Sequence, residues 1–170
     1  ENPVFGSVAP ALKGELTVVS SGKTEVFEAM KPILEKIAKE IFHLPTPSSA
    51  TKMKLINNLC LGSFMATLAE CTALAESCEI PKAKALEILG VGGGQSLVLK
   101  AKTQKLIDED FSAHFSNNAI NKDLHLLQDL AYNLKLPLYS ACLPKELFSK
   151  MKMMGKGEED FSSIYQLFKK

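Results

Sequence analysis

A long, proline-free and mostly apolar stretch from about Ala50 to Cys78 constrains the fold of this chain more than any other feature. Its pattern predicts one helix, which would measure roughly 40 Å at 1.5 Å per residue. Small residues recur along it at steps of four, three and four: Gly62, Ala66, Ala69 and Ala73. Such a stripe lets another helix approach closely. We therefore expect this helix to be the central spine of a helical domain.

Strand patterns precede this helix, and only helical patterns follow it. Short apolar or β-branched runs predict strands ending at Phe5 and at residues 16–20 and 40–44. Between them, a helix is predicted from Glu25 to Lys39, with an inward face of Phe27, Met30, Leu34 and Ile37. Later helices are expected at about residues 81–89, 96–107, 118–135, 140–154 and 161–168. The helix at 118–135 has a predicted buried face of Ile120, Leu124, Leu127, Ala131 and Leu134.

The predicted organisation is therefore a small α/β piece over residues 1–47, followed by an all-helical domain over residues 48–170. An open parallel sheet needs several strands and covering helices, and the first part supplies few. The chain also starts without an initiator Met. We expect that a larger sheet domain precedes Glu1 in the complete protein.

Composition excludes several classes of function. The net charge is +1, and no basic run is interleaved with aromatic residues, so no nucleic-acid partner is expected. The longest uncharged run, Leu55 to Ala69, is too short to span a bilayer, and no membrane association is expected. The four cysteines lack CxxC spacing, which is typical of reduced thiols in a cytoplasmic protein and not of a zinc site.

Lys54, Asn57 and Asn58 form the first candidate site. Residues three and four positions apart share a helix face, so these polar groups lie together at the start of an apolar helix. Their burial is costly unless something polar binds there. A lysine can donate a proton to a developing alkoxide, and an amide can hold the same oxygen. The ordinary alternative is a solvated helix start on the surface.

Two further candidates are less specific. Gly6-Ser7 follows a strand, and consecutive N–H groups there can hold a carboxylate, although most such pairs are only turns. Phe115 lies in a loop, and Lys122 and Asp123 are predicted at the start of the exposed part of an amphipathic helix. The glycines at 90–94 follow a helix and lack GxGxxG spacing, so we interpret them as a helix terminator.

Taken in order, these segments resemble the β-hydroxyacid dehydrogenase family. The matching segments are residues 3–7 with 14–17, Lys52 to Asn58, Phe115 with 122–124, and 155–162. The Met-Lys-Leu context and the Gly-Ser pair are most similar to the glyoxylate/succinic semialdehyde reductase branch. Family members usually carry a serine at the position of Phe5, which separates this chain from the family pattern at the substrate anchor.

The resemblance implies a fold, a cofactor and residue roles. The fold would be the C-terminal end of a Rossmann domain that binds NAD or NADP, followed by a 6-phosphogluconate dehydrogenase-like helical domain. Lys54 and Asn58 would be catalytic, and Lys122 would approach the cofactor. The residues expected to line or support the substrate site are Gly6, Ser7, Asn57, Phe115 and Asp123.

The expected function of the full-length chain is hydride transfer between a nicotinamide and a small carboxylate-bearing semialdehyde or hydroxy acid, such as glyoxylate or succinic semialdehyde. We expect the fragment alone to be inactive, and the protein to form a homo-oligomer. A catalytically silent helical module for oligomerisation or scaffolding is the alternative. A third possibility is a helical bundle that binds a partner helix through the small-residue stripe.

Overall fold

The computed structural model describes residues 1–169, and these divide into two compact units, the first Glu1–Asn57 and the second beginning at Asn58. The boundary between the units falls inside the long helix α3, Ser49–Ser77. α3 confirms the predicted spine helix to within one residue at each end. The predicted domain boundary at residue 47 stays a prediction.

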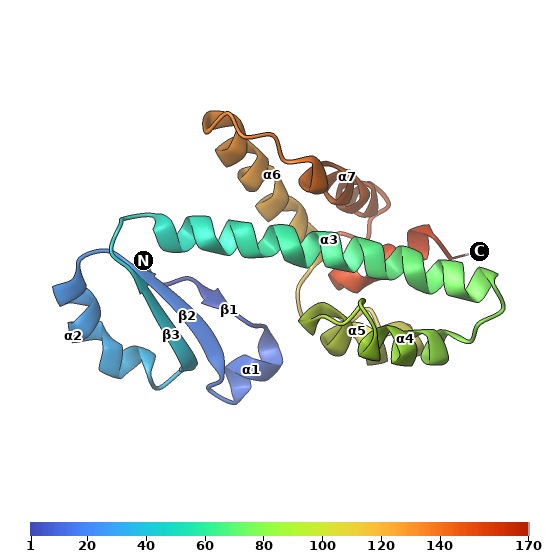
Figure 1. Ribbon diagram of the computed structural model, residues 1–170, viewed down its shortest axis with the longest axis horizontal. Helices are drawn as coiled ribbons and strands as arrows, with labels where there is room; N and C mark the ends of the chain where they lie inside the picture. Colours follow the sequence, from blue (N-terminus) through green and yellow to red (C-terminus); the bar gives the residue numbers. More distant parts are fainter. Residues whose placement is uncertain (170) are drawn as a thin grey trace. The chain divides into compact units, whose positions relative to one another are not determined.

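The N-terminal unit contains a three-stranded sheet in the order β1-β2-β3 (Figure 1). β1 (Val4–Phe5) runs antiparallel to β2 (Leu16–Ser21), and β2 runs parallel to β3 (Ala38–Leu44). The parallel pair requires a crossover, which α2 (Thr24–Leu34) supplies. A five-residue helix, α1 (Val8–Leu12), was not predicted and follows the Gly6-Ser7 turn.

The core of this unit lies between α2 and the sheet. Val18, Leu34 and Ala38 are buried, and Phe27 packs against them as predicted. The prediction that α2 continues to Lys39 is wrong, because Ala38 is extended and pairs with Leu16 in the parallel ladder.

Two of the four residues predicted on the inward face of α2 are not buried. Met30 and Ile37 were expected there, but they are 36% and 44% exposed. Ile37 lies beyond the last residue of the helix, so it cannot follow the helical period. The helical pattern therefore ends at Leu34 and does not continue into the connection before β3.

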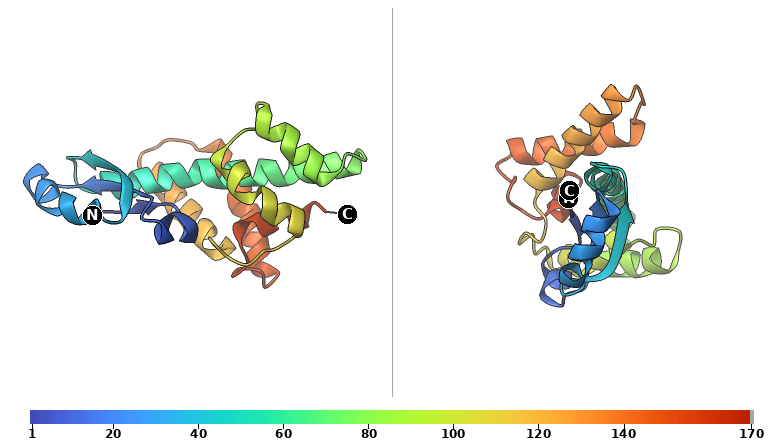
Figure 2. Two further views of the ribbon diagram at one scale, coloured as in Figure 1. Left: turned by 90° about the horizontal axis from the view of Figure 1, so that it is seen from below. Right: turned by 90° about the vertical axis from the view of Figure 1, so that its left-hand side faces the viewer.

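The C-terminal unit is helical, as predicted. After the spine come α4 (Lys82–Val91), α5 (Leu97–Asp108), α6 (Asn117–Asn133), α7 (Tyr139–Met153) and a 3-10 helix, η1 (Phe161–Leu167). Figures 1 and 2 show α4 and α5 on one side of α3 and α6 with α7 on the other. Large buried side chains fill this unit: Met65, Leu86, Leu106, Ile120, Leu124, Phe148, Met151 and Tyr165. Leu134 was predicted on the buried face of α6, but it lies past the helix end and is 66% exposed.

The stripe of small residues on α3 is buried inside the chain. Gly62, Ala66, Ala69 and Ala73 are all inaccessible or nearly so. A Cβ atom at Gly62 would lie 3.2 Å from the Leu124 side chain of α6, so the missing side chain allows the two helices to approach. The prediction that this stripe binds a partner helix or a second copy is therefore wrong, because its residues are already buried inside this chain.

By length and composition alone, α3 also passes the test for a membrane-spanning helix. Core helices of water-soluble proteins pass the same test, and 44% of its most apolar window is buried inside the chain. Apolar side chains of α3, among them Met65, Ala66 and Leu68, are buried in the core of the chain.

Candidate functional site

The first group of predicted site residues lies on α3. Lys54 and Asn57 are half-buried, and Asn58 is only 4% exposed. Because α3 is continuous, Lys54 and Asn58 are four residues apart on one helix and share a face. The predicted placement of an amine one turn before an amide is confirmed.

Asn58 is held by a carboxylate from α6. Its Nδ2 donates a hydrogen bond to Oδ2 of Asp123 over 2.7 Å, and both side chains are buried. A carboxylate can only accept hydrogen bonds, so the amide nitrogen must face Asp123 and the rotation of the amide is fixed. Hydrogen bonds to a charged group are stronger than those between neutral groups.

The prediction that Asp123 begins the exposed part of α6 is wrong. Asp123 is 7% exposed and lies three residues after Ile120 and four before Leu127, both of which are buried. It therefore lies at the edge of the inward face, where the hydrogen bond from Asn58 offsets the cost of removing the carboxylate from water. The neighbouring Lys122 is solvated as expected: its side chain is 68% exposed, and its Nζ lies 3.2 Å from Oδ1 of Asp123.

Phe115 belongs to another cluster of the same unit. Its ring packs edge-on against Phe161 of η1, with centroids 5.8 Å apart and planes at 79°. Its backbone N–H donates to Oδ2 of Asp160 over 3.2 Å. The structure thus brings Asn58, Lys122 and Asp123 together, and it places Phe115 with η1.

Gly6 and Ser7 lie in the N-terminal unit, between β1 and α1. Gly6 has φ of +119°, and a Cβ atom there would lie 2.8 Å from the Leu16 side chain, so only glycine fits. Gly6 is exposed, and Ser7 makes no side-chain cap to α1. The backbone of this turn can therefore be reached by an anionic group.

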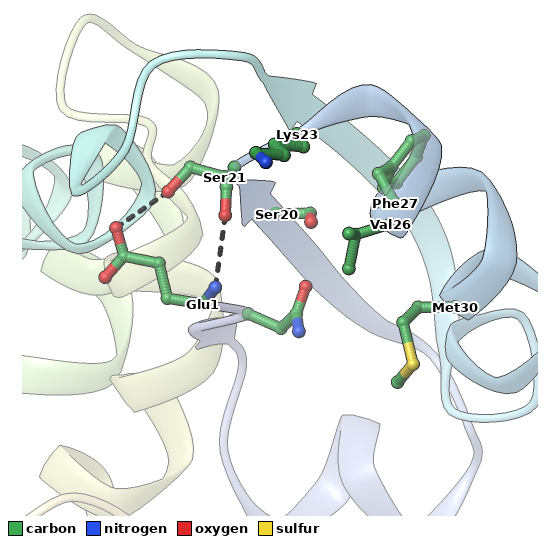
Figure 3. Close-up of a pocket in the computed structure, with 9 residues that line it drawn as sticks. Glu1, Ser20, Ser21, Lys23, Val26, Phe27 and Met30 are labelled. Carbon is green, nitrogen blue, oxygen red and sulfur yellow. Dashed lines mark hydrogen bonds between the residues drawn. The ribbon is translucent and has the colours of Figure 1, made fainter.

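A small pocket in the N-terminal unit lies at the end of β2 and the start of α2 (Figure 3). Ser21 donates from its hydroxyl to the Glu1 carboxylate over 2.7 Å, which closes one side. Its volume of about 50 Å³ is far below the several hundred Å³ usual for ligand sites. None of the predicted site residues lines it, so we assign it no role.

A buried ion pair between Lys102 of α5 and Asp160 was not predicted from the sequence. Nζ of Lys102 lies 2.8 Å from the carboxylate, and the two side chains are 7% and 0% exposed. A signal for it exists in the sequence: Lys102 falls on the apolar face of the predicted helix, with Val98 and Leu106. A lysine on such a face needs a buried anion.

The ionised form of Asp160 is favoured by its neighbours. Burial by itself raises the pKa of Asp160, but the hydrogen bond and charge of Lys102, together with hydrogen bonds from Ser162, outweigh burial. The pKa of Asp160 therefore lies below its ordinary value.

Comparison with known proteins agrees with this architecture. Residues 48–168 match the family model described as "NAD-binding of NADP-dependent 3-hydroxyisobutyrate dehydrogenase". Residues 1–45 match the model described as "NAD binding domain of 6-phosphogluconate dehydrogenase". The predicted fold class, a Rossmann-type α/β piece followed by a helical domain, is confirmed.

Individual relatives are similar over almost all of this chain. The 2-(hydroxymethyl)glutarate dehydrogenase of Eubacterium barkeri is 32% identical, over 98% of this chain and 56% of the relative. Glyoxylate/succinic semialdehyde reductase 1 of Arabidopsis thaliana is 29% identical, over 99% of this chain and 58% of the relative. The crystal structure of 3-hydroxyisobutyrate dehydrogenase from Salmonella typhimurium has a TM-score of 0.91 at 30% identity, over 98% of this chain and 59% of that one.

The chain spans about half the length of the curated relatives it matches. The match of the 3-hydroxyisobutyrate dehydrogenase model nevertheless extends over well more than half of this chain. Both segments, the α/β piece and the helical unit, match families of nicotinamide-dependent dehydrogenases in the predicted order. The chain therefore belongs to the β-hydroxyacid dehydrogenase family of NAD(P)-dependent enzymes.

Proposed function

We propose that the full-length protein is a dehydrogenase or reductase that transfers a hydride between NAD(P) and a small aldehyde or hydroxy acid bearing a carboxylate. The observation that carries the proposal is the buried Asn58–Asp123 hydrogen bond, one helical turn from Lys54. A fixed amide beside an amine is the arrangement that acid–base chemistry on a carbonyl oxygen requires.

Each residue of the proposed site has a separate role in the reaction. The nicotinamide supplies or accepts the hydride when it is bound. During reduction, Lys54 delivers a proton from Nζ to the substrate oxygen, where negative charge develops, and Asn58 orients that oxygen. The reverse reaction returns the hydroxyl proton to Lys54. Backbone N–H groups at Gly6 and Ser7 hold the carboxylate, so that the carbonyl presents one face, and Asn57 and Phe115 complete the substrate site.

The charges in the described residues fit an anionic dinucleotide. The ammonium group of Lys122 is exposed, and its contact with Asp123 links it to the residue that fixes Asn58. We assign Lys122 to a phosphate or ribose hydroxyl of NAD or NADP. Either nucleotide satisfies this contact.

Replacing the proposed acid is the direct test. In the full-length protein, Lys54→Ala should lower kcat by roughly 10²- to 10⁴-fold, the usual contribution of a positioned acid or base. Lys52→Ala, on the same helix but exposed, is the matched control and should keep kcat within about twofold of the wild type. Both variants should retain the wild-type circular dichroism spectrum.

Two outcomes contradict the proposal. Equal turnover of Lys54→Ala and wild type removes the mechanism. A folded wild-type protein that oxidises neither NADH nor NADPH with any substrate of this class favours the catalytically silent oligomerisation or scaffold module.

For the substrate, we propose glyoxylate or succinic semialdehyde. The similarity to the Arabidopsis glyoxylate/succinic semialdehyde reductase supports this choice, whereas Phe5 at the usual serine position and the glutarate-type relative argue for a wider comparison. Measurement of kcat/KM for the oxidation of glycolate, 4-hydroxybutyrate and 2-(hydroxymethyl)glutarate, the alcohol forms of the three candidates, decides the question. The proposal requires one of the first two to be preferred by at least about tenfold.

We also propose a cytoplasmic homo-oligomer. Because the small-residue stripe of α3 is buried, the oligomer surface must lie elsewhere. The α6–α7 connection exposes a group of apolar side chains that suits this role: Tyr132, Leu134, Leu136 and Tyr139 are 56–84% exposed. Light scattering on the full-length protein should give a multiple of the monomer mass. The Leu136→Lys variant should give a lower mass, closer to that of the monomer.

A further inference from the structure

The Lys102–Asp160 pair needs an explanation beyond packing, because burying two charges is costly. The gain from a buried ion pair seldom exceeds the cost of removing both ions from water. Here the pair is almost completely inaccessible, with Nζ 2.8 Å from the carboxylate. Such pairs add little net stability, and in some proteins they fix one arrangement of their surroundings.

The other hydrogen bonds accepted by Asp160 show which segments the ion pair holds in place. Oδ2 accepts the consecutive backbone N–H groups of His114 and Phe115 at 2.9 and 3.2 Å. Oδ1 accepts the backbone N–H and the hydroxyl of Ser162 at 3.1 and 2.7 Å. The carboxylate thus joins α5 and η1 to the segment just before α6, at the residue that carries the Phe115 side chain.

Backbone hydrogen bonds also join the segment before α6 to the residues on either side of Asp160. The N–H of Asp160 donates to the carbonyl of Phe111 over 2.8 Å, and the N–H of Phe161 donates to the carbonyl of Phe115 over 2.9 Å. The N–H of Asn117, the first residue of α6, donates to the carbonyl of Glu159 over 2.9 Å. The segment before α6 is therefore paired along its length with residues 159–161.

The ring of Phe115 is fixed by the same elements. It packs edge-on against Phe161, which is 2% exposed. The ammonium group of Lys102 lies 4.8 Å from the centroid of the Phe161 ring. Backbone and side chain of Phe115 thus both depend on contacts made by Lys102, Asp160 and Phe161.

We propose that Lys102 and Asp160 are positioning residues that set the orientation of Phe115 in the substrate site. This inference rests on the proposed function, in which Phe115 lines that site. The pair does not contact substrate. It acts by holding the backbone N–H groups of residues 114 and 115, and hence the direction in which the ring points.

Kinetics of Asp160→Asn in the full-length protein test this role. The amide keeps the size of the carboxylate but loses its charge and one acceptor oxygen. We expect KM for the preferred substrate to rise by about tenfold or more, since small displacements of positioning groups have large effects. The Kd of the nicotinamide nucleotide should stay within about twofold.

A control and a double variant separate positioning from a general loss of stability. Tyr165→Phe removes a partly buried hydrogen bond of this unit, to Glu76, and should leave KM unchanged. If Asp160 acts through Phe115, Asp160→Asn should raise KM by less than about twofold in a Phe115→Ala background. An equal rise in both backgrounds, or a lower melting temperature with unchanged KM, overturns the proposal.

A measurement without turnover keeps the proposal independent of the enzyme assignment. With 4-fluorophenylalanine at position 115, Asp160→Asn should shift or broaden the ¹⁹F resonance, and Tyr165→Phe should not. If Asp160→Asn does not fold, Ser162→Ala removes one hydrogen bond from the same carboxylate and should move the signal as well. An unchanged resonance contradicts the positioning role whether or not the protein is an enzyme.

Discussion

At the scale of single residues, the sequence predicted that Lys54 and Asn58 share a helix face, but not which residue Asn58 contacts. The spacing of Lys54 and Asn58 requires only a helix, so their common face could be inferred from local periodicity. The carboxylate that binds Asn58 is 65 residues away in the sequence, and it is brought there by the packing of α6 on α3. Asp123 was accordingly expected in solvent, and its burial became evident only from the structure.

Removing this carboxylate should destabilise the C-terminal unit. Asp123→Ala removes the buried carboxylate that accepts from Asn58, and losing this charge-assisted hydrogen bond should cost about 1–3 kcal/mol. Asp129→Ala, an exposed position of the same helix, should change the free energy of unfolding by less than about 0.5 kcal/mol. Urea denaturation followed by circular dichroism compares the two, and equal effects contradict the buried hydrogen bond.

At the scale of elements, helix positions followed from the sequence and several helix ends did not. α3 was predicted within one residue at each end, because prolines at positions 47 and 81 bracket a stretch that contains none. The end of α2 was not, because pairing of β3 with β2 overrides the helical period at Ala38. The contact of Gly62 with α6 was also not predicted, because a stripe of small residues can pack against a helix of the same chain or of another chain.

The contact at Gly62 gives a test of the α3–α6 packing. Gly62→Leu places a large side chain where even a Cβ atom is 3.2 Å from Leu124, so overpacking should cost about 1–3 kcal/mol. Thr67→Leu, an exposed position of α3, should be close to neutral or stabilising. Thermal denaturation of both variants measures the difference. A Gly62→Leu variant as stable as the control means that this face of α3 is open.

The connection of α5 to η1 through Asp160 should depend on pH. The folded-state pKa of Asp160 lies below its ordinary value of 3.8, so its charged form contributes stability that is fully present above about pH 4. This contribution is lost as pH falls through the lowered pKa. The difference in unfolding free energy between wild type and Asp160→Asn should therefore be constant from pH 7 to pH 5 and shrink towards pH 3. A difference that grows on acidification contradicts the charged pair.

At the scale of the whole molecule, family membership was predictable because several motifs occur in one order at family spacing. The fold class followed from the change from strand to helical patterns near residue 46. Gly6 and Ser7 lie in one unit and Asp123 in the other. Their joint action in one site is part of the proposed function.

A crystal structure of the full-length protein with a nicotinamide nucleotide and a bound hydroxy acid would measure the distance from Lys54 to the substrate. We expect the Nζ of Lys54 and the amide of Asn58 within about 3 Å of the substrate hydroxyl, the hydrogen-bond reach of a catalytic acid. We also expect that the Asn58–Asp123 bond is retained and that the substrate carboxylate lies on the Gly6-Ser7 backbone. A Lys54 side chain that points into bulk water, away from the bound acid, would rule out the proposed mechanism.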